Sequence, residues 1–145
     1  MTPLAVIVGT TMGGAEAVAD ELADKLAQHQ IQCQQFLDPT LEQLTPFPHW
    51  LIVTSTHGAG DLPDNLLPFA NSLESAQLSG TQFAICGIGD SSYDTFCGAA
   101  RTLDRLLQQA GAQPLVNKIE IDVQAVDLPE DRALEWIDEL ISIFN

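Results

Sequence analysis

The first stretch with chemical potential is residues 9–16, Gly-Thr-Thr-Met-Gly-Gly-Ala-Glu, which separates an apolar run from an amphipathic segment. Hydroxyls and glycines there would let the backbone surround an anion at the start of a helix. No lysine or arginine precedes Lys25, so N–H groups, hydroxyls and the helix dipole would have to hold a phosphate. Neither the Walker A pattern nor the dinucleotide-binding pattern G-x-G-x-x-G is present. The stretch therefore predicts either a phosphate-binding loop or a tight turn capped by threonine.

Two further stretches of this kind follow apolar runs, at residues 54–65 and 87–98. Each contains glycines that permit close backbone approach and one planar side chain, His57 in the first and Tyr93 in the second. Tyr93 is the only tyrosine of the chain. Its position after an apolar run favours stacking on a flat ring over an unspecialised surface role.

The surrounding segments alternate between short apolar runs and helical periodicity. The runs predict strands at residues 4–8, 31–36, 50–53, 83–88 and 115–121. Apolar residues at helical spacing predict helices at residues 15–28 and 96–110, and a last helix through 134–144 with Pro129 near its start. This alternation predicts one parallel sheet with helices on both faces. Ligands bind beyond the carboxyl ends of such strands, where the three stretches would meet.

The composition indicates one acidic globular domain, residues 1–145. The chain has 46% apolar residues, enough for its own core. Twenty acidic residues against five basic ones give a net charge of −15, which argues against nucleic-acid binding. The acidity suits a basic partner protein, and it equally suits a protein that charge keeps in solution.

Other bulk features predict a cytoplasmic monomer without membrane contacts. No apolar run approaches the ~18 residues that a membrane span needs. The first residues show no basic region or small-residue cleavage site of a signal peptide. Cys33, Cys86 and Cys97 show no C-x-x-C spacing, which predicts free thiols in a reducing compartment. Cys33 and Cys86 lie in strand runs, and for Cys97 packing is favoured over reactivity.

The three stretches together resemble those of flavodoxins and of the FMN domains of diflavin reductases, with the greatest similarity to MioC-type short flavodoxins. The resemblance spans residues 4–136 and also includes residues 128–131, Glu135 and Trp136. It implies a flavodoxin-like doubly wound five-stranded parallel sheet in the order 2-1-3-4-5. The implied function is that of an electron carrier that holds FMN non-covalently and is not itself an enzyme. A flavodoxin reductase would be the donor and a metabolic redox enzyme the acceptor.

The resemblance also implies a flavin site in three parts. The first loop would hold the FMN phosphate, the other two would flank the isoalloxazine with Tyr93 on one face, and Asp122 would contact the ribityl chain. The residues assigned in this way are Thr10, Thr11, Met12, Gly13, Gly14, Ala15, Ser55, Thr56, His57, Gly58, Gly89, Asp90, Ser91, Ser92, Tyr93, Phe96, Cys97 and Asp122. No catalytic residue and no metal ligand is assigned.

Three positions depart from the family pattern. Met12 and Ala15 stand where the usual phosphate loop has hydroxyls, and His57 replaces a larger aromatic residue, so FMN would be held less tightly. The resemblance implies that Gly58 can turn its carbonyl toward the flavin during reduction, which glycine permits at little steric cost. Acidic residues in the ring loops would disfavour an anionic reduced flavin and make the reduced protein a strong donor.

Three other classes share this topology. A receiver domain needs acidic residues after the first and third strands, where threonines and a serine stand instead. A small FMN-dependent reductase would need a further substrate pocket, and 145 residues leave no added segment to build one. A flavin-free adaptor is conceivable because of Met12 and Ala15.

Overall fold

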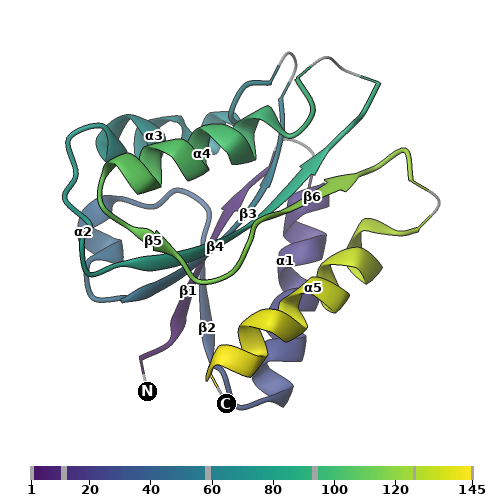
Figure 1. Ribbon diagram of the computed structural model, residues 1–145, viewed down its shortest axis with the longest axis horizontal. Helices are drawn as coiled ribbons and strands as arrows, with labels where there is room; N and C mark the ends of the chain where they lie inside the picture. The colour runs from purple at the N-terminus through teal and green to yellow at the C-terminus, as the bar shows by residue number, and fades with distance from the viewer. Residues whose placement is uncertain (1, 11–12, 58–59, 93–94, 126, 145) are drawn as a thin grey trace.

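A computed structural model of the chain describes residues 2–10, 13–57, 60–92, 95–125 and 127–144. Its elements in chain order are β1 (Leu4–Gly9), α1 (Gly14–Gln28), β2 (Cys33–Phe36), α2 (Leu41–Leu44), β3 (His49–Ser55), the 3₁₀ turn η1 (Asp64–Leu66), α3 (Leu67–Leu73), β4 (Gln82–Gly89), α4 (Gly98–Gln109), β5 (Gln113–Pro114), β6 (Ile119–Asp122) and α5 (Pro129–Phe144). The strands form one parallel sheet in the order β2-β1-β3-β4-β5, and β6 also pairs with β4. Figure 1 shows α1 and α5 on one face of the sheet and α3 and α4 on the other. The predicted doubly wound sheet is confirmed.

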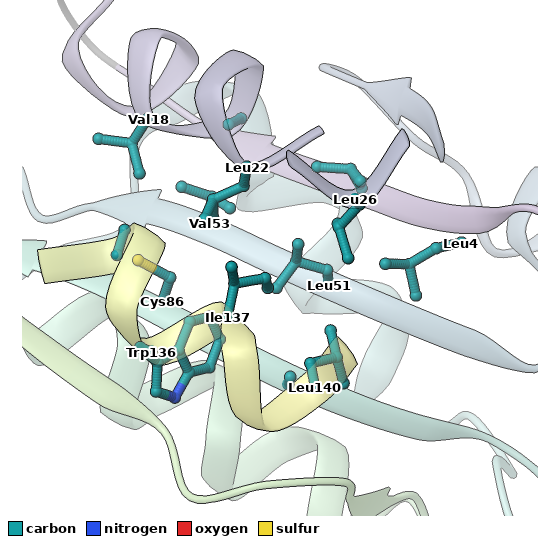
Figure 2. Packing of buried hydrophobic residues seen from close by; sticks show 14 of the residues in the cluster. Leu4, Val18, Leu22, Leu26, Leu51, Val53, Cys86, Trp136, Ile137 and Leu140 are labelled. Atoms are coloured by element: carbon teal, nitrogen blue, oxygen red, sulfur yellow. The ribbon is translucent and has the colours of Figure 1, made fainter. Parts of the chain in front are cut away.

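Alternating side chains of the central strands pack against the helices on opposite faces of the sheet. Leu51 and Val53 of β3 belong to the cluster under α1 and α5, whereas Trp50 and Ile52 belong to the cluster under α3 and α4. Figure 2 shows the first cluster, with residues of α1 and α5 packed over β3. Because a strand buried on both faces needs apolar residues at every position, these strands read as continuous apolar runs.

The predicted fifth strand, residues 115–121, is corrected by the structure. Two short strands, β5 and β6, pair with β4 instead, and residues 115–118 bulge out between them. Between the pairs Phe83↔Pro114 and Cys86↔Ile119, β4 contributes two residues and the opposite segment four, so the register cannot be continuous. The Trp136 indole N–H donates to the carbonyl of Asn117 at 2.9 Å, which satisfies a polar group in this excursion.

Two helical segments lie where the sequence patterns above predict none. Helix α2 begins with a reciprocal capping box, in which Thr40 and Gln43 each accept a hydrogen bond from the other's backbone N–H. The turn η1 and helix α3 bury Leu66, Phe69 and Leu73 against the sheet. The spacing of these apolar residues is helical, but the segment is short and carries Pro68 in its first turn.

The cysteines are free thiols, as predicted. Cys86 and Cys97 are buried, and Cys33 is half-buried. Within the described residues, no helix is long and apolar enough to cross a membrane.

Candidate functional site

The three predicted loops meet at one edge of the sheet. In the register, Gly9 lies beside Thr54, Ser55 beside Ile88, and Gly89 beside Asp122. These pairs close the ladders at the carboxyl ends of four neighbouring strands. The loops after β1, β3, β4 and β6 therefore surround a common space, as the switch-point rule for such sheets expects.

That space consists of two adjoining cavities. One, of about 230 Å³, lies between the loops after β3 and β4 and also touches the residue after β6. Its lining is Ser55, Thr56, Ile88, Gly89, Asp90, Thr95, Phe96, Cys97 and Val123. The other, of about 570 Å³, extends between the starts of α1 and α5 and shares four of these residues. Its lining is Gly14, Ala15, Ala17, Val18, Ser55, Thr56, His57, Ile88, Val123, Pro129 and Glu130.

The start of α1 is open to an anion. Gly13 is the N-cap residue with a φ of 89°, and as a glycine it has no side chain to cap the helix. The hydroxyl oxygen of Thr10 accepts a hydrogen bond from the Gly13 N–H at 2.8 Å, which folds the loop in front of the helix. The first N–H groups of a helix have no intrahelical partner, and a Cβ on Gly13 or Gly14 would meet no atom within 4 Å. Space is therefore open beside these two glycines, at the helix end whose N–H groups lack intrahelical partners.

The ring-side loops, residues 55–61 and 89–98, are in contact through glycine. A Cβ on Gly98 would lie 2.8 Å from both the Cα and the carbonyl oxygen of Gly60. His57 and Asp61 exchange backbone hydrogen bonds of 2.7 and 2.8 Å, which closes the first of these loops into a narrow turn. Gly60 itself has a φ of 97°, a conformation that favours glycine. The two loops are therefore in direct contact at Gly60 and Gly98, a contact called the ring-side wall below.

Cys97 is a packing residue of this wall. A Cβ on Gly89 would lie 2.8 Å from the Cys97 backbone nitrogen and 2.9 Å from its Sγ, so no larger residue fits there. The Cys97 side chain is buried, and burial raises the pKa of its thiol to about 12. A raised thiol pKa and burial agree with the packing role that the sequence favours for Cys97.

Thr56 carries an unsatisfied polar atom. Its Oγ1 is buried and has no hydrogen-bond partner within the described part of the chain. The residue lines both cavities. Because an unpaired buried hydroxyl costs free energy, a turn of the Thr56 side chain toward a ligand in the cleft would supply the missing hydrogen bond. The neighbouring Thr54 hydroxyl, in contrast, donates to the carbonyl of Ser55 at 2.8 Å.

The carboxylates of Asp90 and Asp122, called the brace below, hold the loop after β4 by hydrogen bonds. Asp122 Oδ1 accepts hydrogen bonds from the backbone N–H groups of Ser91, at 3.0 Å, and Gln124, at 2.9 Å. Asp90 accepts from the backbone N–H and hydroxyl of Ser92 and from the Gln124 amide. Hydrogen bonds from Ser91 and Gln124 lower the pKa of Asp122, and those from Ser92 and Gln124 lower the pKa of Asp90. The loops after β4 and β6 are thus tied together.

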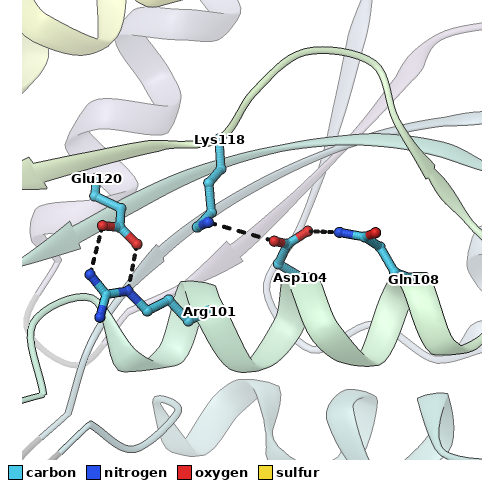
Figure 3. Close-up of polar contacts among 5 residues, drawn as sticks. All are labelled: Arg101, Asp104, Gln108, Lys118 and Glu120. Atoms are coloured by element: carbon cyan, nitrogen blue, oxygen red, sulfur yellow. Dashed lines mark hydrogen bonds and ion pairs between the residues drawn. The ribbon is translucent and has the colours of Figure 1, made fainter.

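Ion pairs hold α4 against β6. Arg101 donates two hydrogen bonds to Glu120, at 2.7 and 2.9 Å, and Lys118 lies 3.6 Å from Asp104 (Figure 3). Exposed pairs of this kind contribute about 0–1 kcal/mol each. The pairs link the helix that begins at Gly98 to the segment around β6.

Most of the predicted site residues surround the two cavities or their rims. Ala15, Gly14, Ser55, Thr56, His57, Gly89, Asp90, Phe96 and Cys97 line them. Thr10 and Gly13 are hydrogen-bonded to each other in the loop between β1 and α1, which is called the anion loop below. Ser91, Ser92 and Asp122 belong to the brace and do not line either cavity. Thr11, Met12, Gly58 and Tyr93 lie outside the described residues, so their predicted roles stay predictions.

Sequence reasoning missed three residues of this region. Ile88 and Val123 line both cavities, and Val123 is 46% exposed. The available signal for Val123 was an apolar residue two positions after the predicted strand 115–121. Asn65 was visible only as the last residue of the second loop, and its contacts with the first loop have no local signature.

Comparison with known proteins places this fold and site in one class. A family model described as Flavodoxin matches residues 6–136. Protein MioC of Escherichia coli K12 is 41% identical over the full length of both chains. Flavodoxin YqcA of the same organism is 31% identical, with 96% of each chain covered. A solved structure of a cysteine-to-alanine mutant of flavodoxin from Pseudomonas aeruginosa superimposes with a TM-score of 0.88 at 29% identity, covering 97% of each chain.

These matches agree with the doubly wound α/β fold and with a cleft at the carboxyl edge of its sheet. The chain belongs to the flavodoxin family, and it is of the MioC type. Membership in this family implies flavin binding, and flavodoxins are electron carriers rather than enzymes.

Proposed function

We propose that the chain binds FMN non-covalently and carries single electrons from a flavodoxin reductase to a metabolic redox enzyme. The observation that carries the proposal is the juxtaposition of a helix start capped by a glycine with a cleft lined by Thr56, whose hydroxyl has no partner among the described residues. A monophosphate matches the first feature and a polar, planar ring system matches the second. FMN combines both groups in one molecule.

The described residues would divide the binding between them. N–H groups at the start of α1 would hold the phosphate, with help from the helix dipole and the Thr10 hydroxyl. Thr56 Oγ1 would hydrogen-bond to the cofactor, and Gly89 and Phe96 would lie beside the ring. Bound FMN would supply the one-electron redox chemistry, and the protein would exclude water from one side of it.

The surface around the cleft suits brief contact with basic partner proteins. Four of the five large apolar side chains that are exposed in the described residues lie directly after a strand or at the start of a helix, namely Leu37, Leu67, Val123 and Leu128. Asp61, Asp64 and Glu130 line pockets among them. Mixed apolar and acidic character favours a small transient interface that opposite charge steers.

Flavin titration tests the proposal. We expect the purified chain to bind one FMN, with quenched flavin fluorescence, and to bind riboflavin at least about 10-fold more weakly because riboflavin lacks the phosphate. Equal affinity for both flavins would contradict the phosphate site. Absence of any flavin binding would favour a flavin-free adaptor, and NAD(P)H oxidation without a second protein would favour a reductase.

A further inference from the structure

We propose that Asn65 is the positioning residue of the anion-binding loop, an inference that rests on the proposed function for the identity of the anion. Asn65 lies in η1, between β3 and α3. Its side chain joins two other segments of the chain, the end of β1 and the residue after β2. Asn65 Oδ1 accepts from the Thr10 N–H at 3.1 Å, while Nδ2 donates to the carbonyl of Val8 at 2.7 Å and to the carbonyl of Leu37.

This set of partners determines which way the amide faces. The Thr10 N–H can only donate, and the two carbonyls can only accept. A flipped amide would place oxygen against two carbonyl oxygens and NH₂ against an N–H. Only asparagine, with one acceptor and two donors on a short stem, satisfies all three groups. An aspartate would satisfy Thr10 and repel the carbonyls of Val8 and Leu37.

The hydrogen bond to Thr10 decides which donors of the loop stay available. Because the Thr10 N–H points to Asn65, it does not point to the space in front of α1. The Thr10 hydroxyl oxygen accepts from Gly13, so its hydrogen is free to donate. Among the described residues, the remaining donors for an anion are therefore this hydroxyl and the first N–H groups of α1. Asn65 thus sets the geometry of the anion site without touching the anion.

The turn that carries Asn65 is itself rigidly seated. Leu66 is completely buried, and its backbone N–H donates to Pro63 at 2.9 Å. A Cβ on Gly9 would collide with Thr54 Oγ1 and would lie 2.5 Å from Leu66 Cδ1, so η1 packs directly against the last residue of β1. A residue 55 positions further along the chain is in this way held beside Thr10.

A positioning role makes a prediction that a general structural role does not. If Asn65 only stabilises the fold, its loss should weaken FMN and riboflavin binding by the same factor. If it shapes the anion site, its loss should act on FMN alone, because riboflavin has no phosphate to place. The ratio of the two dissociation constants is therefore the decisive quantity.

The experiment compares Asn65→Asp and Asn65→Leu with Asn71→Asp and Asn71→Leu. Asn71 is exposed on α3 and makes the matched control for charge and size. We expect both Asn65 variants to lose about 10-fold or more in FMN affinity, with riboflavin affinity changed by less than about threefold. Both Asn71 variants should stay within about twofold of the wild type for either flavin. Equal losses for FMN and riboflavin in the Asn65 variants would overturn the inference.

Amide hydrogen exchange on the flavin-free wild type tests the hydrogen bonds of Asn65, called the Asn65 clamp below, without any variant. The Thr10 N–H should exchange slowly, because Asn65 is its acceptor, and exchange at the rate of an open loop would overturn the inference. A wild type that binds no FMN but protects Thr10 would instead overturn the proposed function and leave the clamp in place. The two failures are therefore distinguishable even if a variant does not fold.

Discussion

The two sides of the cleft are held by different chemistry. The anion loop is fixed by the neutral amide of Asn65, whereas the ring-side loop after β4 is fixed by the carboxylates of Asp90 and Asp122. The anion side is also open, since a Cβ on Gly14 meets nothing within 4 Å, and the ring side is tightly packed at Gly98. An anion site needs exposed donors and little added negative charge. A ring wall needs close backbone contact, which glycines allow.

The largest expected effect separates the two sides by steric fit. Gly98→Ala would place a methyl group 2.8 Å from the Gly60 backbone, and we expect a loss of about 1–3 kcal/mol in the free energy of unfolding. Gly14→Ala fills open space at a helical position, so stability should stay the same or rise by about 0.5–1 kcal/mol. Urea unfolding of both variants measures the difference. Comparable losses in the two would show that the ring side is not the tighter wall.

The next effect concerns the hydroxyls at the end of β3. Thr56→Val removes Oγ1, which has no partner among the described residues. We therefore expect the free energy of unfolding of the flavin-free variant to equal that of the wild type or to exceed it by up to about 1 kcal/mol. FMN affinity should fall at the same time. Thr54→Val, the matched control, removes a satisfied buried hydroxyl and should cost about 1 kcal/mol of stability. A destabilised Thr56 variant with unchanged FMN affinity would contradict the assignment.

Acid should loosen the ring side before the anion side. Hydrogen bonds lower the pKa of Asp90 and Asp122 in the folded protein, so their contribution is complete above about pH 4. It is lost as the pH falls through the lowered pKa values, since protonated carboxyls accept these bonds poorly. We expect the Ser91 amide to lose exchange protection in this range, while the Thr10 amide keeps it.

At neutral pH, Asp122→Ala should produce the same loosening at Ser91 without acid. Asp138→Ala, an exposed residue on α5, is a suitable control because it removes one carboxylate far from the brace. Unchanged exchange at Ser91 in Asp122→Ala would show that the brace does not hold the loop.

The smallest effect is electrostatic. Replacing Asp61 and Asp64 with asparagine removes two charges beside the cleft, and replacing Asp20 and Asp24 removes two charges on α1. In stopped-flow reduction by a flavodoxin reductase, the first pair should slow electron uptake by about two- to fivefold at low salt. The second pair should change it less, and FMN affinity should change little in either variant. Equal slowing by the two pairs would mean that only net charge matters.

The sequence alone determined the layered architecture and the region of the site. Apolar runs such as residues 4–8 require burial on both faces, and helical spacing in residues 15–28 requires a packed face, so the alternation already specifies a doubly wound sheet. The glycine-rich stretches could be placed at the carboxyl edge because every parallel strand ends there. Local pattern was sufficient for these conclusions because each depends on the period of a single element.

Tertiary structure decided how the site is held. The Asn65 clamp, the contact of Gly60 with Gly98 and the brace between Asp122 and Ser91 each join residues that are far apart in sequence. The split of the predicted fifth strand also depends on its register against β4. No local period encodes such contacts. They form only because the sheet brings the ends of distant strands within hydrogen-bonding distance, where each buried donor and acceptor must find a partner.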